Sequence, residues 1–110
     1  MKDDRLYLIH ISECIERIES YIGGKGKQQF LDSTLIQDAI IRNLQILAES
    51  TQHLSDDAKD SMSSIDWFKI AGFRNVLVHD YLGVDIERVW NILEKDLPAL
   101  KNAVKKILEQ

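Results

Sequence analysis

Apolar residues recur every three or four positions along almost the whole chain, and this spacing constrains the fold more than any other feature. Such a period places the apolar side chains on one face of an α-helix, whereas a half-buried strand would alternate apolar and polar residues. No convincing alternation is present. The pattern predicts an all-α protein, an antiparallel bundle of about four to five helices in a single domain over residues 1–110. The first apolar stripe consists of Leu8, Ile11, Ile15, Ile18 and Ile22.

A second stripe follows the same spacing on this first predicted helix. It contains Tyr7, His10, Cys14, Arg17 and Tyr21. A helix with two such stripes is expected to contact two neighbours, one of which can be another subunit.

The segment GGKGK at 23–27 ends the first helix, because glycine favours turn conformations. It is not a P-loop: Tyr21 stands where that motif needs a glycine, and Gln28 stands where it needs Ser or Thr. We expect a flexible connector here.

The next helix is predicted from an N-cap at Ser33 to about Leu54. A polar stripe along it either forms a solvated face or lines a cleft. Asp38, Arg42 and Glu49 are its candidate cleft residues. The stripe contains Asp38, Arg42, Gln45, Glu49 and Gln52, and the predicted buried face contains Leu35, Ile36, Ala39, Ile40, Leu44 and Leu47.

The remaining chain is divided by turn and capping signals. Residues 55–66 are polar, with one short helical turn. A helix capped by Ser64 or Asp66 starts near Asp66 or Trp67 and runs into RNVLVH. Asp85 is expected to cap a helix to about Glu94, and Pro98 suits the first turn of a last helix. That last helix has its core face at Leu100, Val104, Ile107 and Leu108, and the tryptophans Trp67 and Trp90 are expected to anchor the bundle.

Composition excludes several classes of protein. The chain has 110 residues, 45% of them hydrophobic, a net charge of −4 and a pI of about 5.3. It therefore lacks the broad basic surface of a nucleic-acid coat, so any nucleic acid would bind a local cluster or a surface made by two chains. The single cysteine, Cys14, excludes an intramolecular disulfide. With no signal peptide or membrane span in the sequence, we expect a cytoplasmic protein.

The segment RNVLVHDY at 74–81 carries the chemistry. On a helix, Asn75 and His79 lie within about 40° of each other, and Arg74 and Tyr81 within about 20°. Arginine can clamp phosphate oxygens, and histidine can move a proton near neutral pH, so the pair suits phosphodiester chemistry without a metal or cofactor. A two-fold dimer would supply a second histidine. The alternative is a solvated helix edge. The other side of this helix, expected to face the core, is Ile70, Phe73, Val76 and Leu77.

The other histidines do not suggest a metal site. His10, His53 and His79 lack the spacing of metal ligands. We expect His10 at an interface or at the core edge, and His53 on the surface.

Longer motifs resemble a known family. WFKIAGFRNVLVHDY, followed by VDIERVW at 84–90 and LPAL at 97–100, is similar to the HepT-like branch of the HEPN superfamily, as is DAIIRNLQILAES at 38–50. The resemblance implies a homodimeric helical bundle that acts as a metal-independent ribonuclease. It also implies the toxin of a type VII toxin–antitoxin pair, whose partner is a minimal nucleotidyltransferase antitoxin. By position, Arg74 and His79 would be catalytic, Asn75 supporting, and Tyr81 the acceptor of AMP.

Two departures leave the motif intact. Asp66 stands where the family often has proline, and Ala48-Glu49-Ser50 stand where it often has Gly-Glu-Ala. A second hypothesis is a non-enzymatic helical partner of a nucleotidyltransferase, in which RNVLVHDY is only a docking and modification surface. The acidic pI favours this hypothesis mildly, whereas the complete Arg-His-Tyr set favours the ribonuclease.

Overall fold

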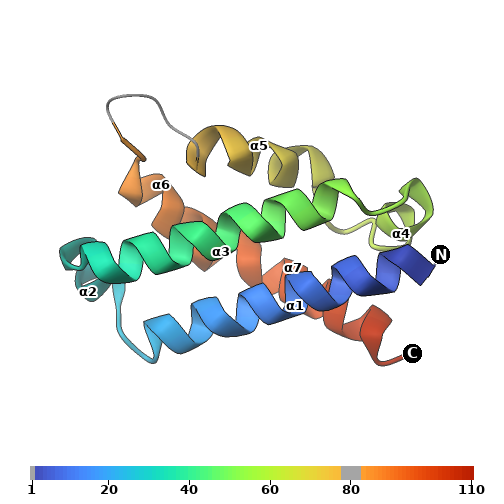
Figure 1. Ribbon diagram of the computed structural model, residues 1–110, viewed down its shortest axis with the longest axis horizontal. Coiled ribbons are helices and arrows are strands. Elements are labelled where there is room, and N and C mark those ends of the chain that lie inside the picture. The colour runs from blue at the N-terminus through green and yellow to red at the C-terminus, as the bar shows by residue number, and fades with distance from the viewer. Residues whose placement is uncertain (1, 78–82) are drawn as a thin grey trace.

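The structure, a computed structural model, describes residues 2–77 and 83–110, and every regular element within them is a helix. In Figure 1, α3 runs antiparallel to α1 on one side and to α5 on the other. The prediction of an all-α antiparallel bundle is confirmed. No helix in the described ranges is long and apolar enough to cross a membrane. The elements are α1 (Lys2–Ile22), α2 (Lys27–Asp32), α3 (Thr34–Gln52), α4 (Asp56–Ser61), α5 (Trp67–Leu77), α6 (Ile86–Asn91), η1 (Ile92–Asp96) and α7 (Leu97–Leu108).

The core lies where α1 meets α3 and α7. Ile11 and Ile15 of α1 and Leu44 and Leu47 of α3 are at most 1% exposed, and burial of each such side chain contributes about 1.5–3 kcal/mol. Cys14 is also buried, so its assignment to the second, semi-polar stripe is wrong. It lies only about 60° around the helix from Ile11. Burial raises the pKa of the Cys14 thiol, which keeps it protonated and unreactive.

Four helices begin at a side-chain cap. In each case a hydroxyl or carboxylate oxygen accepts a hydrogen bond from the backbone N–H three residues later, at 3.0–3.3 Å. The capping residues are Ser33 for α3, Ser55 for α4, Asp66 for α5 and Asp85 for α6. These bonds satisfy backbone donors that the first helical turn leaves without a partner. The caps predicted at Ser33 and Asp85 are confirmed, and of the two caps predicted for α5, Ser64 or Asp66, the structure shows Asp66.

The glycine-rich connector is shorter than predicted. Gly23 and Gly24 have φ of 53° and 82°, which ends α1. The next helix, α2, starts at once, and the Gln29 side chain accepts a hydrogen bond from the Gly26 N–H at 3.0 Å.

The helix α3 differs from its prediction at both ends. Leu35 is 81% exposed although we predicted it to be buried, because it lies about 140° around the axis from the buried Ile40. Gln37 is buried instead, and its amide donates to the carbonyl oxygens of α2 at 2.9 and 3.0 Å. The helix ends at Gln52, with the buried Leu54 beyond its end.

The C-terminal segment is one continuous helix from 86 to 108, where we predicted two. Pro98 lacks an N–H, and its ring would clash with the carbonyl of Glu94 in a regular α-helix. The π-helical turn η1 lies just before it, with the Leu97 N–H bonded to the carbonyl of Ile92. The wider turn accommodates the proline without ending the helix.

The two tryptophans anchor the bundle as predicted. The Trp67 indole N–H donates to the Lys59 carbonyl at 3.1 Å, which fixes the start of α5 against α4. The Trp90 ring lies 5.4 Å from that of Phe30 and joins α6 to α2.

Asp4 joins the start of α1 to the turn after α3. Its two carboxylate oxygens accept hydrogen bonds from the Ser55 N–H and hydroxyl, at 2.8 and 2.7 Å. These bonds stabilise the charged form and lower the pKa of the Asp4 carboxyl.

We expect Asp4→Asn to lower the free energy of unfolding by about 1 kcal/mol at pH 7. Because the folded-state pKa lies below the unfolded one, this contribution is present above the unfolded pKa and is lost as pH falls through the folded pKa. Thermal melts of the two proteins at pH 7 and in acid test this. Their difference should vanish in acid, and Asp3→Asn, at an exposed neighbour, should change little. An equal difference at both pH values would contradict the role of the charge.

Candidate functional site

The helix α5 presents a buried face and an exposed polar face, as predicted. Its buried side chains are Ile70, Phe73, Val76 and Leu77. Arg74 and Asn75 are exposed, on the side that the sequence pattern assigned to them. His79 and Tyr81 lie outside the described residues, so their predicted convergence with Arg74 stays a prediction.

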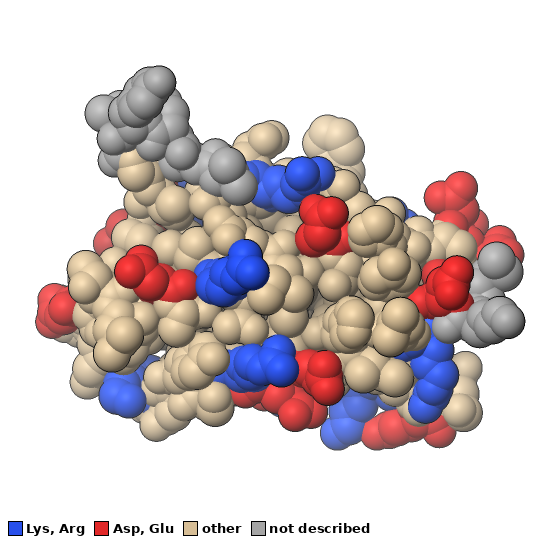
Figure 2. All heavy atoms as spheres, in the orientation of Figure 1, with Lys and Arg blue, Asp and Glu red and all other residues tan. Residues whose placement is uncertain are grey.

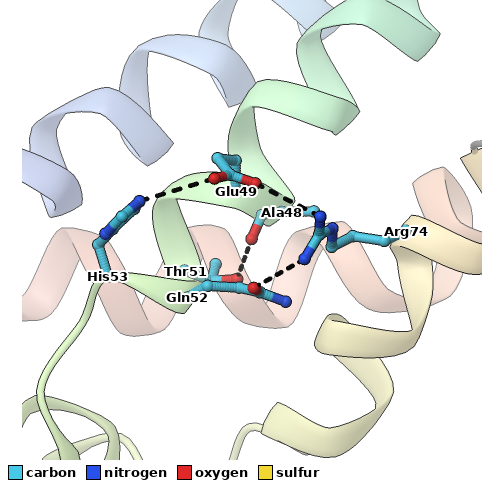
Figure 3. Close-up of polar contacts among 6 residues, drawn as sticks. All are labelled: Ala48, Glu49, Thr51, Gln52, His53 and Arg74. Atoms are coloured by element: carbon cyan, nitrogen blue, oxygen red, sulfur yellow. Dashed lines mark hydrogen bonds and ion pairs between the residues drawn. The ribbon is translucent and has the colours of Figure 1, made fainter.

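Arg74 reaches across to the last turns of α3 (Figure 3). Its Nη1 donates a hydrogen bond to Gln52 Oε1 at 2.9 Å, and its Nη2 lies 3.9 Å from Glu49 Oε2. The Arg74 side chain is 53% exposed. Exposed contacts of this kind are weak, so the guanidinium can exchange them for a stronger anion.

Glu49 also approaches a histidine at the end of α3. His53 Nε2 lies 3.7 Å from Glu49 Oε1, on the side away from Arg74 (Figure 3). The Tyr7 ring of α1 stacks on the His53 ring, with centroids 4.8 Å apart and planes 15° apart. Arg74, Glu49, His53 and Tyr7 therefore form a row that joins α5, α3 and α1.

A hollow of about 450 Å³ lies beside this row. Of the predicted cleft residues, Arg42 and Glu49 line it, whereas Asp38 is exposed and is not among the side chains that form its wall. The stripe on α3 is therefore a wall of a hollow over part of its length. The lining residues on which the site depends are Tyr7, Arg42, Ile46, Glu49, His53 and Arg74.

A second hollow also borders Arg74. It has a volume of about 330 Å³ and is lined by Gln52, Ala71, Arg74 and Asn75. Arg74 thus lines both hollows, and Asn75 lines the smaller one.

The C-terminal end of the described part of α5 is also joined to α3. The Gln45 side-chain amide donates to the Leu77 carbonyl at 3.4 Å. Leu77, the last described residue of α5, therefore lies beside the polar stripe of α3.

Charge on this side of the molecule is mixed. On the face drawn in Figure 2, basic and acidic side chains alternate over α3 and α5 without forming a continuous basic patch. Phosphate binding here would depend on individual arginines. Among the described residues, no three His, Cys, Asp or Glu side chains are grouped so as to hold a metal ion.

Two members of the row are not predicted by the sequence as parts of a site. His53 is exposed, which confirms its prediction as a surface residue, but its place beside Glu49 is not predicted. Tyr7 is predicted only as part of the second stripe, which can face another subunit. The spacing of Glu49 and His53, one helical turn apart, could have indicated their proximity. The position of Tyr7 depends on how α1 packs on α3, and no local pattern indicates it.

Comparison with known proteins identifies relatives over the whole chain. A protein of Methanocaldococcus jannaschii named "Gamma-glutamylcyclotransferase and putative RNase" is 38% identical over 99% of this chain, which spans 49% of that protein, about half its length. A "Putative RNase" of Caldanaerobacter subterraneus subsp. tengcongensis is 32% identical over 100% of this chain and 98% of its own. A "Probable ribonuclease HepT" of Thermococcus cleftensis is 35% identical over 92% of each chain. No solved structure matches significantly. The family model described as "Ribonuclease HepT-like" matches residues 11–107, and the chain therefore belongs to the HepT-like ribonuclease family.

Proposed function

We propose that this protein is a ribonuclease that cleaves RNA without a metal ion, with Arg74 and His79 as its catalytic residues. The observation that carries the proposal is the position of Arg74. In a chain of the HepT-like ribonuclease family, the Arg74 side chain is half exposed, lines two hollows and makes its contacts with Gln52 and Glu49 at the surface. A site for a phosphodiester needs a cation in such a position.

Arg74 binds the scissile phosphate. Its planar fork can donate to two non-bridging oxygens, which gain negative charge as the phosphorus becomes five-coordinate. Gln52 and Glu49 hold the side chain over α3 until RNA replaces the Gln52 contact. Asn75, the next residue, supports binding as a neutral donor to the same phosphate.

His79 moves the proton. The ribose 2′-hydroxyl attacks the phosphorus, its proton passes to the imidazole, and the bond to the 5′-oxygen of the next nucleotide breaks. That oxygen takes up a proton from an imidazolium, and the first product ends in a 2′,3′-cyclic phosphate. Leu77, the last described residue before His79, is joined to α3, because its carbonyl accepts a hydrogen bond from Gln45.

We expect the protein to act as a homodimer. The attacking 2′-hydroxyl needs a base to take its proton, and the departing 5′-oxygen needs an acid to supply one. A two-fold axis near residues 74–81 supplies one His79 from each chain. Light scattering at micromolar concentration should give twice the mass of the chain. A monomeric mass together with full activity would contradict the shared site.

We further propose that the protein is a cytoplasmic toxin of a type VII toxin–antitoxin pair. Its partner is a minimal nucleotidyltransferase antitoxin, which silences it by adding AMP to Tyr81. The intact Arg-Asn-His-Tyr set at 74–81 supports this part of the proposal. A small nucleotidyltransferase encoded by the neighbouring reading frame would be expected.

The ribonuclease is tested with purified protein and RNA in excess EDTA. We expect cleavage at an undiminished rate and products that end in 2′,3′-cyclic phosphate. A requirement for a divalent ion would show the mechanism to be wrong. If the protein leaves RNA intact but binds the transferase, it is the non-enzymatic partner.

A further inference from the structure

We propose that the hollow beside Arg74 is a nucleobase subsite, which holds the base next to the scissile phosphate and favours guanine. The inference rests on the proposed ribonuclease function. At about 450 Å³ the hollow falls within the range of small-molecule sites. Three helices contribute to it, through Tyr7 of α1, five residues of α3 and Arg74 of α5, together with His53 at the C-cap of α3.

One wall of the hollow is a stacked aromatic pair. Tyr7 and His53 lie with their rings nearly parallel, 4.8 Å apart. Nucleobases extend such stacks whatever their identity, because every base has an aromatic face. The Asp4 hydrogen bonds to Ser55 fix the start of α1 against the turn that follows His53, so the pair is held in place before RNA binds. Ile46 adds a partly buried apolar surface.

Glu49 can read the edge of the base. Its side chain is 59% exposed, and its oxygens lie 3.7 Å from His53 and 3.9 Å from Arg74. Both distances exceed those of a hydrogen bond, so the carboxylate can still accept two short ones. Guanine presents two adjacent donors, N1–H and the 2-amino group. Adenine places the acceptor N1 at that position, which a carboxylate repels.

The two arginines make the hollow attractive to an RNA strand. Arg42 and Arg74 line it together with the single carboxylate of Glu49. A phosphate bound by Arg74 therefore places the adjoining base at the mouth of the hollow, with Arg42 available to the phosphate on its far side. In this arrangement the base stacks on the pair of Tyr7 and His53, and the phosphate binds Arg74.

Binding of short RNAs that cannot be cleaved tests the subsite without depending on catalysis. Fully 2′-O-methylated oligouridines with one guanine, inosine or adenine are measured by fluorescence anisotropy. Wild type should bind the guanine ligand about tenfold more tightly than the adenine ligand, with inosine, which lacks the 2-amino group, between them. The ratio compares two ligands bound by the same protein. A change in the affinity for phosphate affects both ligands equally and therefore cancels from the ratio.

Three variants separate the parts of the subsite. Glu49→Gln should reduce the guanine-to-adenine ratio to about one, whereas Glu19→Gln, at an exposed glutamate paired with Lys101, should leave it unchanged. Tyr7→Leu should weaken all three ligands about tenfold and keep the ratio. Melting curves check that each variant is folded.

Two outcomes would overturn the subsite. One is a ratio near one in wild type, and the other is a ratio that Glu49→Gln does not change. If wild type nevertheless cleaves unmodified RNA in EDTA, the ribonuclease stands and only the subsite is refuted. Guanine-selective binding without any cleavage would support the subsite and refute the ribonuclease.

Discussion

Arg74→Ala is expected to lower the rate of RNA cleavage by at least about 10²- to 10³-fold, the usual loss when a donor to a developing oxyanion is removed. The melting temperature should hardly change. The Arg74 side chain is half exposed, and its contacts with Gln52 and Glu49 lie at the surface. Truncation of such a side chain opens no cavity, and surface substitutions usually alter the free energy of unfolding by less than about 0.5 kcal/mol.

The measurement is a single-turnover cleavage rate, with the protein in excess over the RNA and at a concentration well above the dissociation constant. Arg88→Ala is a matched control, because Arg88 is an exposed arginine of α6 that lies outside the row formed by Arg74, Glu49, His53 and Tyr7. It should retain the wild-type rate. His79→Ala should lose as much activity as Arg74→Ala. If Arg74→Ala keeps a tenth of the activity or more, the phosphate is held elsewhere.

The parts of this site that the sequence could predict are those that depend on one helix. The period of α5 predicts Arg74 and Asn75 on its exposed side and Phe73 and Leu77 on its buried side, and the structure confirms it. The stripe on α3 was recognised in the same way, although the sequence left open whether it was a solvated face. The contact of Gln52 with Arg74 answers that question for its C-terminal part.

The parts that the sequence could not predict depend on how helices pack. Tyr7 reaches His53 only because α1 lies antiparallel to α3 with their ends aligned, and Asp4 fixes this register through Ser55. Asp38 belongs to the same stripe as Glu49, yet it lies beyond the hollow because the hollow follows only the last turns of α3. The spacing of a stripe predicts the direction in which its side chains point. The packing of the neighbouring helices determines which part of the stripe lines a hollow.

The errors in the fold have a similar origin. Pro98 predicts the first turn of a new helix, since proline usually stands there. In the structure a π-helical turn at Ile92–Asp96 accommodates it. Capping residues such as Ser33 and Asp85 were predicted correctly because a cap is a contact within four residues. Whether a helix continues through a proline depends on whether a wider turn forms before it, and no single residue predicts such a turn.

Tyr81→Phe is expected to retain most of the cleavage activity but to escape silencing by the nucleotidyltransferase. The phenol takes no part in the proposed proton transfer, so loss of its hydroxyl should cost little. Leu77, four residues earlier in the sequence, is joined to α3, because its carbonyl accepts a hydrogen bond from Gln45. AMP on Tyr81 would bring at least one phosphate charge close to Arg74. It would compete with RNA for the guanidinium and occupy the path of the strand.

Incubation with the transferase and ATP, followed by intact-mass spectrometry and a cleavage assay, measures both parts of this prediction. Wild type should gain whole AMP units and lose cleavage, whereas Tyr81→Phe should gain none and remain active. Tyr21→Phe is the matched control, because Tyr21 is a partly buried tyrosine of α1 outside the site, and it should be modified and silenced like wild type. Equal labelling of Tyr81→Phe would place the modification on another residue. Labelling of wild type without loss of cleavage would mean that AMP on Tyr81 does not reach the phosphate held by Arg74.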